Sequence, residues 1–243
     1  MTAKEHYDHH LGNFYAWMIG EFQDIQSIQE SFFKTNAVLP KETRVALDLG
    51  CGNGLQTISL AQLGFAVEAV DFNRQLLRDL EERRGKLSIH IHEQDMLEFL
   101  RDFDKKADVI TCMGDTLTHL PTSGDVEALI RLAYDTLADG GKLILSYRDL
   151  STPLEESQRF IPVRSNEKRI HTCFLEYFSD HVKVYDILHE RDGNAWNQTV
   201  SWYPKLRLKN KDVEDLLQKS KFKITVRETI NRMLYLIAEK QNG

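Results

Sequence analysis

The sequence predicts an α/β fold with a doubly wound, largely parallel sheet. Three observations predict it. Residues 45–72 read as an apolar run, a glycine-rich loop, a helical segment and a second apolar run, which is one βαβ unit. Short apolar runs then alternate with amphipathic segments up to residue 149, and again from residue 209. The chain has 243 residues, 42% of them hydrophobic, so it can bury a core without disulfides.

The βαβ unit places polar groups at one edge of the predicted sheet. Its first strand ends at Asp48, before a loop containing Gly50, Gly52 and Gly54. Residues 55–63 have helical spacing, and the second strand, residues 66–70, ends in Asp71. Because parallel strands end at the same edge of a sheet, both carboxylates and the glycine loop are expected to meet there around a ligand.

The spacing of these residues indicates which kind of ligand binds. Asp71 comes 21 positions after Gly50, close to the roughly 20 expected when a carboxylate binds ribose hydroxyls. A dinucleotide site would need a small residue where this chain has Leu55. Asp48 would repel a pyrophosphate and attract an ammonium group. The ligand is therefore predicted to be a cationic nucleoside that carries an amino acid.

The segment Asp48-Leu49-Gly50-Cys51-Gly52-Asn53-Gly54, together with Asp71, resembles the first two motifs of class I methyltransferases that use S-adenosylmethionine. The resemblance is strong over 44–149 and moderate over 209–243, and it implies a Rossmann-like seven-stranded sheet. It also implies the residues that bind the cofactor. Asp48 and the loop would face the methionine part, Asp71 the ribose, Phe72 the adenine and Met113 the sulfonium; the implied loop residues are Gly50, Cys51 and Gly52.

Helices and strands continue in order after this unit. Asn73 is expected to cap a helix, and residues 87–92 form a third strand that leads to Asp95. The resemblance implies that Asp95 accepts a hydrogen bond from the adenine amine and that Met96 packs against the ring. Thr122 or Ser123 is expected to cap a later helix that ends at Gly140-Gly141.

The methyl acceptor is expected beyond the fourth strand, residues 107–112, and the fifth, residues 142–147. Ligands in open α/β sheets bind outside the carboxyl ends of strands, so His119, Tyr147 and Arg148 are the candidate catalytic residues. His119 has an ordinary pKa near neutrality and would serve as a base, or it caps a turn. Arg148 either clamps an acceptor carboxylate or pairs with Asp149 to hold the loop.

Two further regions would cover the sheet. Residues 1–43 read as a helical cap of two amphipathic helices with a break at Gly20, and Tyr15, more than Tyr7, is expected to reach the cofactor. Residues 151–208 are rich in β-branched and aromatic residues and read as an antiparallel β insert and substrate lid, with strands at 159–164, 169–178, 182–190 and 199–208. Residues 44–150 and 209–243 form the cofactor-binding domain. Asn210 is expected to cap its last helix, before a closing hairpin that turns near Asn231.

Composition and motifs limit the kinds of molecule that the protein is expected to bind. The net charge of −6 argues against a nucleic-acid surface, and the Asn/Asp-Pro-Pro-aromatic motif of nucleic-acid amine methylases is absent after the fourth strand. Three cysteines without metal-ligand spacing favour reduced thiols and no metal. The amino terminus does not read as a signal peptide, and no apolar run would span a bilayer, so a cytoplasmic protein without membrane contact is expected.

These observations predict an S-adenosylmethionine-dependent methyltransferase that moves a methyl group to the N, O or S atom of a small molecule by in-line displacement. Two alternatives stay open: a methyltransferase that acts on RNA or protein, and a non-catalytic S-adenosylmethionine-binding protein. The identity of the acceptor, the use of a general base and the oligomeric state are not determined by the sequence.

Overall fold

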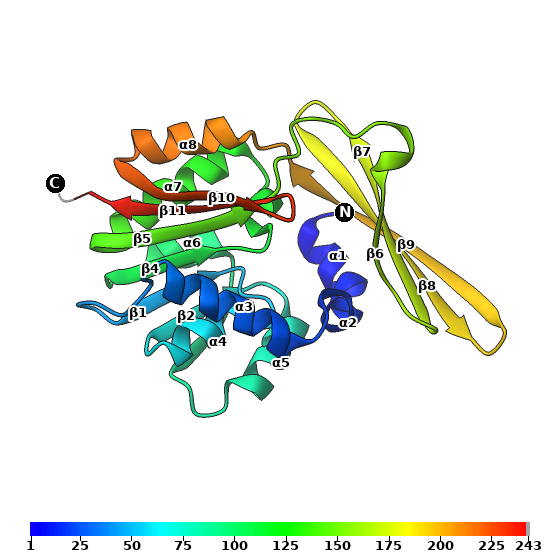
Figure 1. Cartoon of the computed structure of the whole chain (residues 1–243), viewed down its shortest axis with the longest axis horizontal. Helices are drawn as coiled ribbons and strands as arrows, with labels where there is room; N and C mark the ends of the chain where they lie inside the picture. The colour runs from blue at the N-terminus through cyan, green and yellow to red at the C-terminus, as the bar shows by residue number, and fades with distance from the viewer. Residues whose placement is uncertain (242–243) are drawn as a thin grey trace.

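The computed structural model describes residues 1–241 and contains two separate sheets (Figure 1). Seven strands form the larger sheet in the order β10-β11-β5-β4-β1-β2-β3, and four strands form the smaller one in the order β6-β7-β8-β9. The predicted α/β class, the seven-stranded sheet and the antiparallel insert after the fifth strand are confirmed.

The larger sheet is parallel except at one edge. Its parallel strands are β1 (Val45–Leu49), β2 (Ala66–Asp71), β3 (Ile89–Glu93), β4 (Ala107–Cys112) and β5 (Leu137–Tyr147). The antiparallel pair β10 (Phe222–Ile230) and β11 (Met233–Lys240) extends it beside β5. The order of the strands reverses between β1 and β4, and this switch point is where open α/β sheets bind ligands.

Helices cover both faces of this sheet and form two apolar cores. One core contains residues of α6 (Met96–Asp102), α7 (Ser123–Thr136) and α8 (Asn210–Lys219), and the other contains residues of α4 (Leu55–Gln62) and α5 (Arg74–Arg84). Asn73 and Thr122 cap α5 and α7 as predicted. The prediction that Asn210 caps α8 is wrong, because Lys209 occupies the cap position and Asn210 is already helical.

The amino-terminal region contains more helices than the two predicted. They are α1 (Ala3–His9), the 3₁₀ turn η1 (Leu11–Asn13), α2 (Tyr15–Ile19) and α3 (Phe22–Thr35). The break at Gly20 lies between α2 and α3, where its φ of 109° favours glycine. Helix α3 packs on α4, whereas α1 and α2 lie between the two sheets (Figure 1). The Asn73 amide donates to Asp8 at 2.8 Å and so links α1 to the start of α5.

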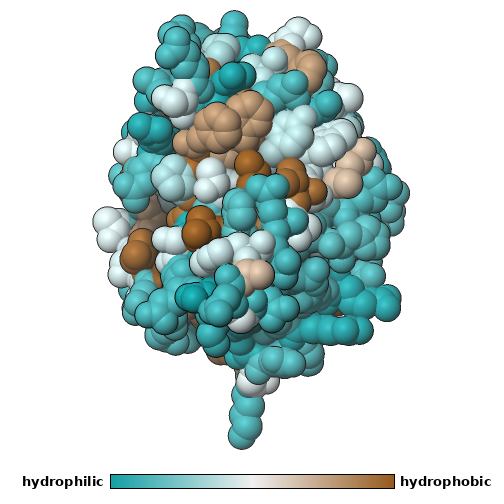
Figure 2. All heavy atoms as spheres, turned by 90° about the vertical axis from the view of Figure 1, so that its right-hand side faces the viewer, coloured by the Kyte–Doolittle hydropathy of each residue, from teal (hydrophilic) through white to brown (hydrophobic). Residues whose placement is uncertain are grey.

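The smaller sheet consists of β6 (Phe160–Ser165), β7 (Arg169–Tyr177), β8 (His181–Asp192) and β9 (Ala195–Leu206), preceded by the 3₁₀ turn η3 (Glu156–Arg159). Successive side chains along β8 alternate between partly buried and buried, as expected for a sheet with one covered face. Figure 2 shows the side of the molecule that carries this sheet, where apolar side chains lie in small groups among hydrophilic ones.

The closing hairpin turns at Asn231 and Arg232, as predicted near Asn231. Both residues have positive φ, 50° and 63°, between the paired residues Ile230 and Met233. This is the backbone of a two-residue type I′ turn, whose twist matches that of the flanking strands. Within residues 1–241, no helix combines the length and apolarity needed to cross a membrane.

Candidate active site

A cavity lies at the switch point, between the carboxyl ends of β1, β2 and β4 and the helices α1 and α2. Its volume is about 80 Å³. The glycine loop forms its floor, and aromatic rings from α1 and α2 form its roof. Its polar and apolar walls are Tyr7, Tyr15, Gly50, Cys51, Gly52, Asn53, Leu55, Gln56, Val70, Asp71, Phe72, Leu76, Gln94, Met96, Met113, Gly114, Thr116 and His119.

The glycine loop approaches its surroundings more closely than a side chain would allow. The backbone N–H groups of Gly50 and Cys51 both donate to the Val70 carbonyl, so the loop is fixed to the end of β2. Gly50 has a φ of 70°, and a Cβ atom there would lie 2.2 Å from Cγ2 of Thr116. Only glycine therefore fits, and the loop presents bare backbone to the cavity.

Asp71 lines the cavity at the end of β2 with two carboxylate oxygens that each have acceptor capacity left. Oδ2 accepts from the Gly52 N–H and Oδ1 from the Asn73 N–H, both at 2.8 Å. Burial raises the pKa of Asp71 despite these bonds. Since each ionised carboxylate oxygen can accept a further hydrogen bond, the group is suited to a vicinal diol such as that of a ribose.

Asp48 is not among the residues that line the cavity. Its carboxylate is 1% exposed and accepts hydrogen bonds from the Thr57 hydroxyl of α4 and the Thr111 hydroxyl of β4. Burial raises the pKa of Asp48 to about 6, although the two hydroxyls oppose the shift. The carboxylate thus holds three elements together behind the glycine loop, rather than facing the methionine part directly as the sequence suggested.

An outer cavity of about 650 Å³ adjoins the first one. Phe72, Met96 and His119 line both cavities. Asp95 lines only the outer cavity, where one of its oxygens caps α6 by accepting from the N–H groups of Leu97 and Glu98. Its second oxygen makes no hydrogen bond within residues 1–241, so it can still accept one from an amine.

His119 lies at the junction of the two cavities, at the end of the 3₁₀ turn η2 (Thr116–His119). Its ring stacks on Tyr203 at 5.3 Å and meets Tyr7 edge-on at 5.7 Å. Burial lowers the pKa of His119 to about 3, and the nearby Lys205 adds to the shift. The imidazole is therefore neutral at physiological pH, with a lone pair that can accept a hydrogen bond.

Tyr15 and Tyr7 bring two phenols into the same cavity. Tyr15, predicted from the sequence to reach the cofactor, lines the cavity, and burial raises its pKa to about 12. Tyr7, which the sequence favoured less than Tyr15, also lines the cavity and meets Phe72 edge-on at 6.0 Å and Tyr15 at 6.1 Å. Its exact position depends on how α1 docks against Asn73.

The structure does not bring Tyr147 to the site. Its side chain is fully buried in the apolar core on the α8 side, and burial raises its pKa well above the ordinary value. The reason is strand alternation, since neighbouring side chains on β5 point to opposite faces. Ser146, the residue before it, faces the site and accepts from the Gly114 N–H at 2.8 Å. Contrary to the expectation that Tyr147 is catalytic, its side chain does not reach the cavity.

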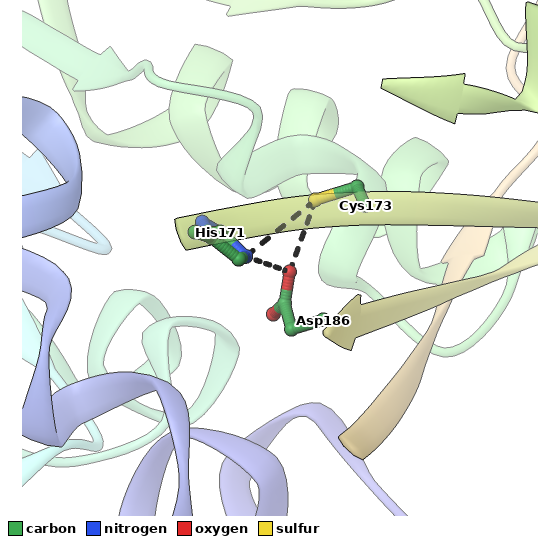
Figure 3. Close-up of side chains that lie close together, drawn as sticks. All are labelled: His171, Cys173 and Asp186. Carbon is green, nitrogen blue, oxygen red and sulfur yellow. Dashed lines mark hydrogen bonds and ion pairs between the residues drawn. The ribbon is translucent and has the colours of Figure 1, made fainter. Parts of the chain in front are cut away.

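Two buried carboxylates attach the smaller sheet to the rest of the molecule. The first is Asp186 on β8, which contacts His171 and Cys173 on β7 (Figure 3). It also lies 2.8 Å from Nε2 of His6 on α1, so the roof helix is joined to the lid by a buried contact.

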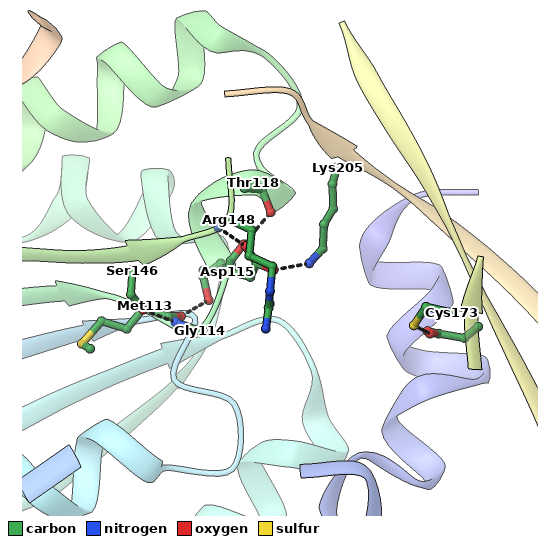
Figure 4. Close-up of polar contacts among 10 residues, drawn as sticks. Met113, Gly114, Asp115, Thr118, Ser146, Arg148, Cys173 and Lys205 are labelled. Carbon is green, nitrogen blue, oxygen red and sulfur yellow. Dashed lines mark hydrogen bonds and ion pairs between the residues drawn. The ribbon is translucent and has the colours of Figure 1, made fainter. Parts of the chain in front are cut away.

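The second carboxylate is Asp115, which follows β4 and receives two cations (Figure 4). Lys205 of β9 and Arg148 both donate to Oδ2 at 2.7 Å, and the Arg148 N–H donates to Oδ1 at 2.8 Å. Burial opposes ionisation of Asp115, but the two cations outweigh it and hold its pKa well below the usual range. Arg148 thus pairs with Asp115, whereas the sequence suggested Asp149 or an acceptor.

Comparison with known proteins supports what this geometry indicates. A family model described as "Methyltransferase domain" matches residues 46–141, the segment that contains the glycine loop, Asp71 and β4. The match covers about two fifths of the chain and makes this segment similar to a methyltransferase domain. The ubiquinone biosynthesis O-methyltransferase of Xanthomonas euvesicatoria pv. vesicatoria is 34% identical over 102 residues, which are 41% of each chain. The cypemycin N-terminal methyltransferase of a Streptomyces species is 34% identical over 110 residues, 45% of this chain and 44% of the relative.

The match to these curated relatives covers about two fifths of their length, whereas the fold as a whole resembles solved methyltransferases throughout. The CcbJ methyltransferase of Streptomyces caelestis superposes with a TM-score of 0.80 at 16% identity, over 97% of this chain and 98% of the other. The methyltransferase CalS10 of Micromonospora echinaspora gives 0.69 at 15% identity, over 90% and 91%. The methyltransferase fold therefore includes the amino-terminal helices and the smaller sheet.

The residues that line the cavity suit S-adenosylmethionine as a ligand. The nucleoside requires an acceptor pair for the ribose and apolar walls for the adenine, and Asp71, Phe72 and Met96 provide these groups. The methionine part requires space beside bare backbone, which the loop from Gly50 to Gly54 provides.

Proposed function

We propose that this chain is an S-adenosylmethionine-dependent methyltransferase that acts on the N, O or S atom of a small molecule. The observation that carries the proposal is the roof over the cavity. Tyr7 and Tyr15 cover it from α1 and α2, and both side chains are partly buried. A folded protein surface or a duplex would first have to displace these helices, whereas a small acceptor fits the space between His119 and the outer cavity.

The cofactor would be held by residues of the first three strands. Asp71 accepts hydrogen bonds from the ribose hydroxyls, Phe72 and Met96 pack against the adenine, and the backbone of Gly50, Cys51 and Gly52 borders the methionine part. S-adenosylmethionine, when bound, supplies an electrophilic methyl group, so the main task of the chain is to position the acceptor. Met113 and Gly114 lie between the glycine loop and His119, where the methyl group would point.

His119 would orient the acceptor. As a neutral imidazole, it accepts a hydrogen bond from an N–H or O–H group and so directs the nucleophile's lone pair away from itself. A base with a pKa near 3 takes up a proton poorly at neutral pH, which favours acceptors that need little deprotonation, such as an amine that enters neutral. Tyr203, stacked on His119, fixes the orientation of its ring.

The printed names of similar proteins support a small acceptor. They include a ubiquinone biosynthesis O-methyltransferase, an amino pentose methyltransferase and a sugar N-methyltransferase. Two of these three names describe sugar or amino-sugar methylation, and both belong to proteins similar over about nine tenths of this chain. This agrees with the preference for an amine acceptor inferred from His119.

The test is to incubate the protein with methyl-labelled cofactor and a fractionated cell extract. We expect label in the low-molecular-weight pool, and Asp71→Ala should abolish its transfer while leaving the fold intact by circular dichroism. Label found only in tRNA or protein would overturn the small-molecule proposal. Tight cofactor binding by calorimetry with no label in any fraction would favour the non-catalytic alternative.

A further inference from the structure

A buried group of metal-ligand side chains lies in the smaller sheet, outside the cavity. Nε2 of His171 lies 2.9 Å from Oδ1 of Asp186, and Sγ of Cys173 lies 3.0 Å from the same oxygen (Figure 3). Nε2 and Sγ are 3.8 Å apart. We propose that His171, Cys173 and Asp186 bind one Zn²⁺ ion, with the fourth coordination position left to a non-protein ligand.

The strand pair already brings the three ligand atoms together. Cys173 of β7 pairs directly with Asp186 of β8, and His171 lies two residues along β7 on the same face. Tetrahedral zinc with bonds of about 2.0–2.3 Å needs ligand atoms about 3.3–3.8 Å apart. The three observed separations depart from this range by only a few tenths of an ångström, so side-chain rotations would make room for the ion.

The ligand set selects the metal. An imidazole, a thiol and a carboxylate together suit a borderline ion such as Zn²⁺, whereas calcium and magnesium prefer oxygen ligands and Cu(I) prefers sulfur. The charges also balance, since a dipositive ion with a thiolate, a carboxylate and a neutral imidazole has no net charge. Balance matters here because the side chains of His171 and Asp186 are 0% and 2% exposed.

A second layer of contacts orients the ligands. Nε2 of His6 lies 2.8 Å from Oδ2 of Asp186, and Nδ1 of His6 lies 2.8 Å from the Ser201 hydroxyl. This leaves Oδ1 directed at the imidazole and the thiol. Phe14 meets the His171 ring edge-on at 5.1 Å and restrains its rotation. Metal-ligating carboxylates in proteins are commonly held by such hydrogen bonds.

Binding involves a defined proton balance. Burial, together with the neighbouring Asp186, raises the pKa of the Cys173 thiol, so the free site holds it as S–H. When the ion binds, the S–H bond breaks, a Zn–S bond forms, and the proton passes to solvent. Nε2 of His171 binds the ion through its lone pair, so any proton on that nitrogen must leave it. The thiol proton is released when the ion binds. Cys173 is only partly buried, which gives the ion a way in.

The site would fasten the lid. The ion would join β7 to β8, and His6 would transmit that restraint to α1, which roofs the cavity. This site could not be predicted from the sequence, because the spacing of residues 171, 173 and 186 matches no zinc motif. The three residues come together only through the register of the strands. The expectation of no metal, based on cysteine spacing, therefore does not extend to this cluster.

The test uses the full chain, freed of metal with a chelator and titrated with Co²⁺ as a spectroscopic probe for Zn²⁺. We expect one equivalent to bind and to produce a thiolate-to-cobalt charge-transfer band, which Zn²⁺ then displaces. Cys173→Ser should remove the band and lower the affinity by more than about 100-fold, and His6→Gln should lower it about 10–100-fold. The matched control, Cys51→Ser, changes a thiol outside the cluster and should keep the band.

A band that is absent, that survives in Cys173→Ser, or that disappears in Cys51→Ser would overturn the proposal. A second measurement avoids dependence on the folding of a variant. In the unaltered protein, Zn²⁺ should slow alkylation of Cys173 at least tenfold, as mapped by peptide mass spectrometry, while the rate at Cys51 stays unchanged. Equal protection of both cysteines, or of neither, would equally exclude a site at Cys173.

Discussion

The two sides of the cavity are built by different means. The floor relies on backbone: Gly50 is bonded to β2, and its missing Cβ lets Thr116 pack against it. The lid relies on two buried carboxylates, because Asp115 contacts Lys205 and Asp186 contacts His6. The floor should therefore fail when a side chain is added, and the lid when a single charge is removed or titrated.

Removing the lid's cation should have the largest effect. Lys205→Met leaves Asp115 buried with only Arg148 as its partner, and breaking a buried pair costs about 3–5 kcal/mol of unfolding free energy. Arg148→Met is the matched control, because the Arg148 side chain is 47% exposed whereas that of Lys205 is 11% exposed. Urea unfolding should show a loss of no more than about 1 kcal/mol for this variant. Equal losses for the two would show that burial does not set the strength of these contacts.

Adding a methyl group to the floor should have the next largest effect. Gly50→Ala places Cβ 2.2 Å from Cγ2 of Thr116, so the loop must shift. The strained backbone and the displaced loop together should weaken the free energy of cofactor binding by about 3 kcal/mol. Calorimetry should show this as a loss of about 100-fold in cofactor affinity. Gly85→Ala introduces the same methyl group at a φ of 54° with no atom within 4 Å of the new Cβ. This control should bind the cofactor normally, and a similar loss in it would discount the packing argument.

The smallest of these effects concerns Asp48, which lies behind the glycine loop. It tests the contribution of the charge of this residue to stability. The pKa of Asp48 is raised from its ordinary 3.8 to about 6, so the folded state holds the proton more tightly than the unfolded state. Its contribution to stability is complete below pH 3.8 and is lost as the pH rises towards 6. Asp48→Asn does not titrate, so between pH 4 and pH 7 it should lose about 2–3 kcal/mol less than the parent. Denaturant unfolding at both pH values checks this, and identical pH dependence would rule out Asp48 as the source.

The floor could be predicted because its information is local. Gly50, Gly52 and Asp71 lie within one βαβ unit, and the rule that parallel strands end at one edge placed them together. The same rule placed Tyr147 at the site wrongly, because it was applied without considering that side chains alternate between the two faces of a strand. Ser146 and Tyr147 both end β5, but only one of two neighbouring residues in a strand can face the site. A check of periodicity would have selected Ser146, whose neighbour Leu145 is buried in the same core as Tyr147.

The lid could not be predicted in this way. Its strands were found from composition, but the contact between His6 and Asp186 joins residues 180 positions apart. Lys205 and Asp115 are 90 positions apart, with Lys205 in β9 of the smaller sheet and Asp115 in the loop after β4. Such pairs depend on how α1 and β9 dock, which is set by shape and not by any repeating pattern. Asp48 shows the same limit within the floor, since its hydroxyl partners Thr57 and Thr111 divert it from the cavity.

The hairpin that closes the larger sheet allows the protein to be stabilised at residues that do not line either cavity. Arg232 occupies a left-handed backbone position that costs an ordinary side chain about 1 kcal/mol, whereas glycine adopts it freely. Arg232→Gly would give the Asn-Gly sequence that such two-residue turns favour, and it should raise the melting temperature by a few degrees without touching the cavity. Crystallisation trials and screens for the acceptor could then use this more thermostable variant.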